Sequence, residues 1–502
     1  MPQRVLPAAG KRVPATEGVK GHPAETRVPC AKQDWRSGMT DKAGVSCPLA
    51  DGTVYSKRKE FQPFSTPPVE AYTHLVGEEK MERLLQVADG LKGLKLLELN
   101  SSAQGGGVAE MLFSSIPFLN SLGIDAEWKV ITGTREYFQA TKHLHNLLQG
   151  ERGWFTPEMQ RIYSCSLEEC GCNGLIDYDP EAVLVHDPQP LGLVRYLRKG
   201  KEPWLWRCHI DVGEEELQMN PGLWDFVTEW ARHYDAAIFS AAHYVVSRWP
   251  LPKFIIPPFI DPLSEKNREL REKEIEEVLA RYSIDRRIPI IAQVGRFDPW
   301  KGIDRTIATF RRVRQEHTCQ LVLAGGLAAD DPEGERILNR VLQDTDKEDD
   351  IHVLNLPLDD RLRNWREVNA LQRAASVIMQ PSTREGFGLV ITEALWKGKP
   401  VIAADVGAIS LQVRENDTGY FYRGPATAAR RVIQLLDNPR AAQKLGRRGR
   451  LYVKEHFLMP DRIADYLRAL TMARQGVLGQ ALCGHSIVSF HPWAKMSKRR
   501  AA

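Results

Sequence analysis

The sequence predicts an α/β protein built from two doubly wound parallel sheets. Short apolar runs of strand composition alternate along the chain with segments of helical periodicity. This alternation restarts after a stiff proline-rich connector, Pro257-Pro258-Phe259-Ile260-Asp261-Pro262. A chain of 502 residues is long enough for two such series to form separate domains.

The first series begins with a helical pattern over residues 69–91. Six strands are expected to follow it, at residues 94–100, 127–131, 182–186, 204–210, 236–240 and 253–256. A charged helix over 264–282 opens the second series. Its expected strands are 290–294, 320–324, 351–354, 376–379 and 401–403.

These patterns divide the chain into five segments. Residues 1–70 are rich in Pro, Gly, Lys and Arg without a helical or strand period, so we expect an irregular N-terminal extension. The remaining segments are an N-terminal domain over 71–260, a C-terminal domain over 261–450, crossover helices over 451–475 and a frayed basic tail over 476–502.

Composition excludes several classes of protein. With 68 basic and 64 acidic residues, the net charge of +4 is close to balance and makes no case for nucleic acid. No apolar run reaches the roughly 18 residues that a membrane helix needs, and the N-terminus lacks the apolar core of a signal peptide. We therefore expect a soluble cytoplasmic protein.

The stretch from Pro381 to Ala394 is the strongest candidate site. It follows a buried strand and leads into a helix, and Gly386 and Gly388 allow backbone N–H groups to approach a ligand closely. The helix N-terminus favours an anion such as a diphosphate. Glu385 and Glu393 would repel phosphate, so neutral sugar and ribose hydroxyls are their natural partners. The pattern indicates a sugar nucleotide, although on spacing alone a turn without a ligand explains it about equally well.

A second basic turn follows the first strand of the C-terminal series. Arg296 and Lys301, in Gly-Arg-Phe-Asp-Pro-Trp-Lys-Gly, could clamp a diphosphate with a planar fork and a flexible point charge. On general abundance, such side chains on a loop are more often simply solvated.

The N-terminal domain offers three polar strand ends. Gly105-Gly106-Gly107 follows the first strand and enters a helix, but Glu110 breaks the G-x-G-x-x-G pattern, so a nicotinamide cofactor is not indicated. His186-Asp187-Pro188-Gln189 and Cys208-His209-Ile210-Asp211 end two other strands, where ligands bind in open α/β sheets. Packing roles for the histidines, and a tight turn without a ligand for the glycines, remain alternatives.

No metal site is expected. Cys165, Cys170 and Cys172 do not have the paired spacing of a zinc site. Asp177-Tyr178-Asp179 matches an Asp-x-Asp metal motif but precedes a strand, so solvated turn carboxylates are the better interpretation.

Glu385, seven intervening residues and Glu393, with Gly-Phe-Gly between them, resemble the Glu-x7-Glu signature of retaining GT-B glycosyltransferases of family four. The segment around Arg296 and Lys301 resembles the phosphate-binding motif of that family. The resemblance implies a GT-B fold, with two Rossmann-like domains facing a central cleft.

The resemblance also implies roles for these residues. Glu385 would contact sugar hydroxyls, Glu393 would hold the ribose, and Arg296 and Lys301 would bind the donor phosphates. The other implied donor contacts are Gly106, Gly107, Gly386, Phe387, Gly388 and Leu389.

Three further segments, residues 98–110, 185–190 and 206–211, resemble trehalose synthases of the glycosyltransferring type within this family. That resemblance implies transfer from UDP- or ADP-glucose to glucose with retention, giving α,α-trehalose in a reversible reaction. His209 would lie near the transferred sugar and act in catalysis with Arg296, Lys301 and Glu385, while Asp187 and Gln189 would bind the acceptor.

The same resemblance implies no tightly bound cofactor, since the sugar nucleotide is a substrate. Stimulation by Mg²⁺ is compatible with it, although the chain has no motif for the ion. The expected partners are small molecules, and the oligomer considered is a homodimer. A retaining trehalose phosphorylase, another family-four sugar transferase and a non-catalytic sugar-nucleotide sensor remain alternatives, whereas an oxidoreductase would need the missing glycine fingerprint.

Overall fold

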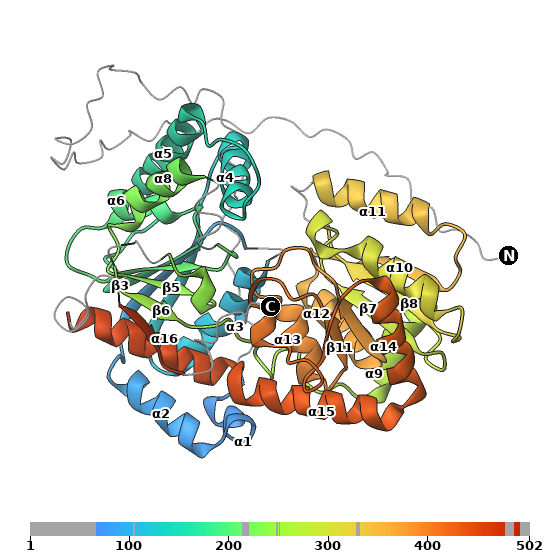
Figure 1. Ribbon diagram of the computed structural model, residues 1–502. Coiled ribbons are helices and arrows are strands. Elements are labelled where there is room, and N and C mark those ends of the chain that lie inside the picture. The colour runs from blue at the N-terminus through green and yellow to red at the C-terminus, as the bar shows by residue number, and fades with distance from the viewer. Residues whose placement is uncertain are drawn as a thin grey trace, which may run out of the picture. The chain divides into compact units, whose positions relative to one another are not determined.

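The computed structural model describes residues 67–103, 106–212, 220–246, 249, 251–327, 332–476 and 486–491. The chain divides into two units, Met1–Pro48 and Leu49–Ala502, and every described helix and strand belongs to the second. The described strands form two sheets in which all pairs are parallel, as the sequence predicts (Figure 1). The predicted N-terminal extension lies outside the described residues except for 67–70.

The first sheet contains seven of the described strands. In spatial order they are β13 (Ile487–Ser489), β6 (Lys253–Ile255), β5 (Ala236–Phe239), β4 (Trp204–Cys208), β3 (Ala182–His186), β1 (Lys95–Asn100) and β2 (Asp125–Val130). Chain order reverses between β1 and β3, which makes this position the topological switch point.

The second sheet contains six of the described strands. In spatial order they are β12 (Tyr420–Phe421), β11 (Val401–Ala403), β10 (Val377–Gln380), β7 (Ile290–Val294), β8 (Gln320–Gly325) and β9 (Ile351–Asn355). Here the order reverses between β7 and β10. β3, β4, β7 and β10 are buried along their whole length, as expected of parallel sheets covered on both faces.

Helices connect the strands and cover the sheets. In Figure 1, α5, α6 and α8 lie on one side of the first sheet and α16 lies on the other. Those of the N-terminal series are η2 (Val69–Tyr72), α1 (Thr73–Val76), α2 (Glu78–Asp89), α3 (Gly107–Ser121), α4 (Arg135–Leu148), α5 (Pro157–Cys172), η3 (Leu191–Leu193), α6 (Val194–Leu197), α8 (Pro221–Ala231) and η4 (Ala242–Tyr244). Those of the C-terminal series are α9 (Glu272–Arg281), η5 (Pro299–Lys301), α10 (Ile303–Val313), α11 (Pro332–Asp344), α12 (Arg361–Ala374), α13 (Leu389–Trp396), η6 (Gly407–Leu411), α14 (Pro425–Asp437), α15 (Pro439–His456) and α16 (Met459–Arg474).

Two predicted helices differ from the observed ones. The helical pattern over 69–91 is divided into η2, α1 and α2, with a break at Gly77, whose φ of 94° no helix accommodates. The charged helix predicted from Ser264 begins only at Glu272, as α9. Only a single turn forms before it, closed by the Arg268 N–H donating to the Ser264 carbonyl at 2.8 Å. The Asn369 side chain on α12 donates 2.9 Å hydrogen bonds to the carbonyls of Glu265 and Arg268, which holds this segment against α12.

The C-terminal end also differs from its prediction. A frayed tail was expected after residue 475, but Ile487–Ser489 forms β13 and extends the first sheet by pairing with β6. The Lys253 N–H donates to the Ser486 carbonyl at 3.0 Å. Backbone hydrogen bonding to an open sheet edge therefore orders a segment that has no distinctive side-chain pattern.

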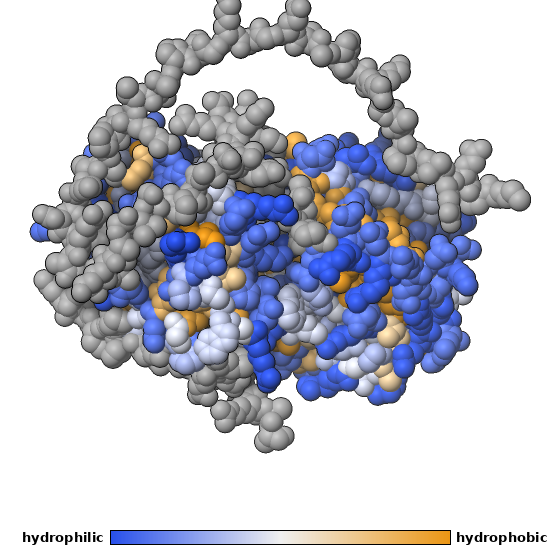
Figure 2. Space-filling view, turned by 90° about the horizontal axis from the view of Figure 1, so that it is seen from above, coloured by the Kyte–Doolittle hydropathy of each residue, from blue (hydrophilic) through white to orange (hydrophobic). Residues whose placement is uncertain are grey.

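The polypeptide returns to the first sheet through α16. This helix packs against α2 (Figure 1). Ile260 pairs with Leu458 just before α16 begins. Hydrophilic residues cover much of the described surface on the face shown in Figure 2, with hydrophobic residues visible in several areas between them. Within the described part of the chain, no helix is both long and apolar enough to span a membrane.

Candidate active site

The strand ends at both switch points carry the candidate site residues. In the first sheet, β1 leads into Ser101 and Ser102, and β3 ends at His186. In the second sheet, β7 leads to Arg296 and β10 leads to the turn containing Glu385. Ligands bind outside the carboxyl ends of parallel strands at a switch point, so the topology brings these segments to one place in each domain.

A cavity of about 410 Å³ connects the two sets of strand ends. Its volume is in the range of small-molecule sites. The predicted residues that line it are Gly106, Gly107, Asp187, His209, Arg296, Lys301, Glu385, Gly386, Phe387, Gly388 and Leu389. We call the side of the site contributed by the first sheet and its helices the N wall, and the side contributed by residues 294–393 the C wall.

The turn before α13 forms the centre of the C wall. Gly388 has a φ of 82° and is the N-cap of α13, so this left-handed position favours glycine. The first N–H groups of α13 have no acceptor within the helix, and Leu389 and Val390 line the cavity. This helix end therefore suits an anionic ligand.

The turn also approaches the N wall closely. A Cβ atom on Gly386 would lie 2.5 Å from the His209 carbonyl oxygen, so only glycine allows this separation. Tyr244, which is 2% exposed, donates a 2.6 Å hydrogen bond from its hydroxyl to the Gly386 carbonyl. The backbone of the turn is thus held directly against the N wall.

Lys301 and Glu385 form an ion pair within the C wall. Lys301 Nζ lies 2.7 Å from Glu385 Oε2, which also accepts a 3.3 Å hydrogen bond from the Ser382 hydroxyl. These contacts use one carboxylate oxygen, so Glu385 Oε1 can accept a hydroxyl from a ligand. The ammonium group also offsets the repulsion that Glu385 would exert on a phosphate.

Arg296 is held less firmly than Lys301. Its side chain is 47% exposed, and its Nη2 lies 3.5 Å from Asp298 Oδ2. His145 from α4 lines the same cavity. Its pKa is lowered to about 4, mainly by burial and further by the positive charge of the nearby Arg296. Arg296 therefore faces a neutral imidazole and can reorient toward an anionic ligand.

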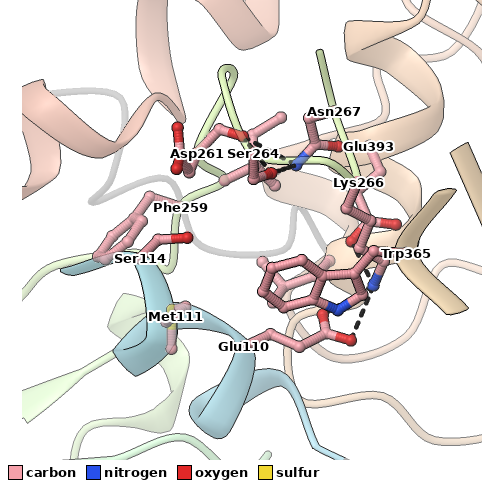
Figure 3. Close-up of a pocket in the computed structure, with 12 residues that line it drawn as sticks. Glu110, Met111, Ser114, Phe259, Asp261, Ser264, Lys266, Asn267, Trp365 and Glu393 are labelled. Atoms are coloured by element: carbon pink, nitrogen blue, oxygen red, sulfur yellow. Dashed lines mark hydrogen bonds and ion pairs between the residues drawn. The ribbon is translucent and has the colours of Figure 1, made fainter. Parts of the chain in front are cut away.

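Glu393 lines a second cavity of about 20 Å³ (Figure 3). This small cavity shares lining residues with the main one. Lys266 lies between two carboxylates, with its Nζ 2.9 Å from Glu393 Oε1 and 2.8 Å from both oxygens of Glu110. Glu110 is on α3 and Glu393 on α13, so Lys266 links the two walls. Gln372 Nε2 donates to the second oxygen of Glu393 at 3.1 Å.

The three charged groups shift one another's pKa. Burial raises the pKa of Glu110, and the negative charge of Glu393 raises it further. Lys266 lowers it, but not enough to offset these two effects. Burial also opposes ionisation of Glu393, but Lys266 and Lys397 outweigh it and hold its pKa below the usual value. Burial would lower the pKa of Lys266, yet the two carboxylates raise it. Lys266 is therefore charged, and Glu393 carries the more stable negative charge of the two acids.

The N wall presents His209 and Asp187. The backbone N–H of His209 donates to Asp187 Oδ1 at 2.8 Å. Asp187 has a φ of 64°, which its short polar side chain tolerates. Burial raises the pKa of Asp187 to about 7. The pKa of His209 is held well below its usual value, mainly by burial and further by the charge on Arg207 and by the neighbouring His186. At neutral pH the imidazole of His209 is uncharged.

Two predicted residues lie away from the main cavity. Gln189 is not among its lining residues, and the Gln189 carbonyl accepts a 2.7 Å hydrogen bond from the Tyr137 hydroxyl. Glu393 is reached through the adjoining cavity, which shares Glu110, Lys266 and Leu389 with the main one. Among the described residues, no group of three or more His, Cys, Asp and Glu side chains is arranged to hold a metal ion.

Sequence reasoning missed two residues that join the walls. Lys266 falls in the segment that was predicted to be a charged helix, and Tyr244 has no motif around it. Lys266 contacts Glu393 and Tyr244 contacts Gly386, and in each pair the two residues are more than 120 positions apart in the sequence. No local pattern could therefore have indicated these contacts.

Comparison with known proteins agrees with this two-walled geometry. Residues 98–246 match the family described as trehalose synthase, N-terminal domain, and residues 274–452 match glycosyl transferases group 1. Trehalose synthase from Pyrococcus horikoshii is 42% identical over 406 residues, which cover 80% of this chain and 95% of that protein. This chain belongs to the trehalose synthase family of glycosyltransferases.

Two further comparisons set this family member beside other proteins. A trehalose phosphorylase from Grifola frondosa is 28% identical over 457 residues, which cover 82% of this chain and 59% of that protein. A solved α,α-trehalose-phosphate synthase (UDP-forming) from Burkholderia vietnamiensis superposes with a TM-score of 0.58 at 15% identity, covering 76% of this chain and 97% of its own. At that identity the superposition shows the shared GT-B fold, with the N wall in the first matched family range and the C wall in the second.

Proposed function

We propose that this glycosyltransferase transfers glucose from UDP- or ADP-glucose to the anomeric hydroxyl of free glucose. The product would be α,α-trehalose, formed reversibly with retention of configuration. The observation that carries the proposal is a single cavity in which Arg296, Lys301 and Glu385 of the C wall face the neutral His209 of the N wall.

Charge on the C wall supports a diphosphate leaving group. Arg296, Lys301 and the N-terminal end of α13 all line the cavity, and each stabilises negative charge that grows on a departing phosphate. Glu385 would then accept hydroxyls of the transferred glucose, and Glu393 would accept the ribose hydroxyls of the nucleotide.

Asp187 bears on how configuration is retained. A double displacement needs an ionised carboxylate behind the anomeric carbon. Asp187 is the cavity carboxyl next to His209, but its raised pKa and its hydrogen bond from the His209 N–H make it a weak nucleophile. We therefore favour front-face transfer, in which the leaving phosphate takes the proton of the incoming hydroxyl.

A trehalose phosphorylase is the second candidate, because the chain also resembles a protein of that name. Such an enzyme would use inorganic phosphate in place of the nucleotide. The adjoining cavity with Glu393 has a volume of about 20 Å³, which is room for a water molecule and not for a ribose, so it does not distinguish the two candidates.

One experiment separates the candidates. The full chain is incubated with glucose and a panel of nucleoside-diphosphate glucoses, and a non-reducing disaccharide is assayed by chromatography. A parallel sample contains trehalose and inorganic phosphate without nucleotide. Disaccharide formation that requires a nucleotide sugar supports the proposal, whereas release of glucose 1-phosphate in the second sample supports the phosphorylase. Lys301→Ala serves as the active-site control for either product.

A further inference from the structure

A row of three side chains, two of them buried, leads from the core of the N-terminal domain to the cavity. Glu98 on β1 and His186 at the end of β3 are each 2% exposed. His186 Nε2 lies 2.8 Å from Glu98 Oε2, and His186 Nδ1 lies 3.0 Å from His209 Nε2. The two imidazole planes are inclined by only 14°. His209, the last of the three, lines the cavity.

The chemistry of the first member sets the direction of these hydrogen bonds. An ionised carboxylate can only accept, so Glu98 requires a proton on His186 Nε2. A neutral His186 then has a lone pair on Nδ1, which must accept from His209 Nε2–H. A neutral His209 with its proton on Nε2 has a lone pair on Nδ1. The ring nitrogen not used in the row is therefore an acceptor.

The surroundings favour this protonation pattern. The guanidinium of Arg207, which is 5% exposed, lies near both Glu98 and Asp187 and supplies positive charge beside the carboxylate. Burial lowers the pKa of His186 and that of His209, so neither ring is charged at neutral pH. The phenol of Tyr466 on α16 also faces Glu98 and Arg207, and burial raises its pKa, so it is neutral.

We propose that Glu98 and His186 are positioning residues that fix the tautomer of His209, so that His209 Nδ1 accepts a hydrogen bond from a sugar hydroxyl in the cavity. The identity of the sugar in this inference rests on the proposed function. The tautomer of His209 does not depend on it.

The tautomer has a consequence for transfer. A sugar hydroxyl that donates to Nδ1 gains electron density on its oxygen, which favours an oxocarbenium-like state at the neighbouring carbon. The opposite tautomer would present an N–H donor at the same position and withdraw density from that oxygen. A fixed acceptor also needs no reorientation during the reaction, which is the advantage of preorganisation.

The first test is spectroscopic and uses the full-length wild-type protein. Nitrogen-15 NMR of labelled histidine distinguishes a protonated ring nitrogen from one with a lone pair, and His209→Asn identifies the signals of His209. We expect the proton on Nε2 and a lone pair on Nδ1, with or without nucleoside diphosphate. A proton on Nδ1 in the free protein would overturn the proposal.

The second test removes the first member of the row. In Glu98→Leu the acceptor is lost, so His186 can adopt either tautomer and His209 should become a mixture. Glu98→Gln keeps an oxygen that can accept and should restore part of the wild-type pattern. We expect kcat to fall on the order of 10- to 100-fold in Glu98→Leu, by analogy with groups that orient metal-bound histidines, and less in Glu98→Gln. The dissociation constant for nucleoside diphosphate, measured by calorimetry, should change less than about twofold because its proposed phosphate contacts, Arg296 and Lys301, lie on the C wall.

Glu367→Leu is the matched control. Glu367 is also a buried carboxylate, 1% exposed, but it binds Arg281, Arg363 and Tyr282 in the C-terminal domain and is not among the residues lining the cavity. If Glu98→Leu lowers kcat no more than Glu367→Leu does, or loses nucleotide affinity in proportion to rate, the role of Glu98 is structural and the proposal is wrong. If the wild type forms no disaccharide from any nucleotide sugar, the proposed function fails while the NMR test still decides the tautomer.

Discussion

On the N wall of the site His209 is held by hydrogen bonds to the neutral His186 and to Asp187, whereas on the C wall Lys301, Glu385 and Glu393 are held by ion pairs. The difference corresponds to the charges that glucosyl transfer would develop. A diphosphate leaving group becomes more negative and requires cations on its side. The sugar becomes more positive, so an imidazolium on the opposite side would oppose transfer and a neutral imidazole does not.

The two walls also differ in what a ligand must displace. On the N wall, a sugar hydroxyl that donates to His209 Nδ1 would displace neither the contact of His209 with His186 nor that with Asp187. On the C wall, a diphosphate would compete with Glu385 for Lys301, and a ribose would share Glu393 with Lys266. Substitutions on the C wall should therefore alter both binding and stability, while those on the N wall should alter mainly the rate.

The largest effect is expected for Lys266→Met. Removal of this buried cation leaves Glu110 and Glu393 facing each other, so we expect the free energy of unfolding to fall by about 3 to 5 kcal/mol. Denaturant titration monitored by circular dichroism measures it. Lys92→Met, which removes the exposed pair with Asp89, is the control and should leave the free energy of unfolding nearly unchanged.

The same variant should show a characteristic pH dependence. Without Lys266 the folded-state pKa values of both carboxyls rise above their unfolded values, so the folded state binds more protons than the unfolded state above about pH 4.5. Stability must then fall as pH rises, more steeply than in the wild type. A stability profile from pH 4 to 8 that parallels the wild type would contradict the bridging role of Lys266.

The next largest effect is expected for Lys301→Ala and Arg296→Ala. Each loss should raise the barrier by on the order of 2 to 4 kcal/mol, as for other preorganised groups that stabilise developing charge. Lys301 should be the more severe of the two, because its removal also leaves Glu385 unneutralised beside the diphosphate. Steady-state kcat measures both, with the exposed Arg312→Ala on α10 as the control. Rates near the wild-type value in both variants would remove the clamp from the mechanism.

His209→Ala should affect the rate but not the binding of nucleotide. We expect kcat to fall on the order of 100-fold while the dissociation constant for nucleoside diphosphate is little changed, since the contact is made mainly in the transition state. Turnover and calorimetry on the same preparation provide the comparison. A parallel loss of nucleotide affinity would place His209 among the donor ligands and weaken the distinction between the walls.

The smallest effect is expected for Asp187→Asn. The amide oxygen can still accept from the His209 N–H, and asparagine tolerates the φ of 64° at this position. The wild-type carboxyl has a pKa of about 7 in the folded state, above its unfolded value, so it makes stability decline as pH rises from about 4 to 7. The variant should show a shallower decline in thermal unfolding over that range. An unchanged slope would mean that Asp187 is ionised in the folded protein.

Much of the fold and of the C wall could be predicted from the sequence. The strands Ala182–His186, Ile290–Val294 and Val401–Ala403 have the predicted bounds, because fully buried strands are apolar runs that end at polar or proline-containing turns. Glu385, Gly388 and Glu393 belong to one turn and helix, and Arg296 and Lys301 to another. Residues this close in sequence keep their spatial relation whatever the rest of the chain does.

Only the tertiary structure decided how these pieces are joined. The row from Glu98 to His209 collects side chains from within β1, from the end of β3 and from just after β4. Lys266 joins carboxylates on two helices of different domains. β13 pairs at the edge of the first sheet through its backbone, which leaves no side-chain signature. Hydrophobic periodicity records which face of an element is buried, but not which distant polar group lies opposite, because that depends on strand order and on how the domains meet.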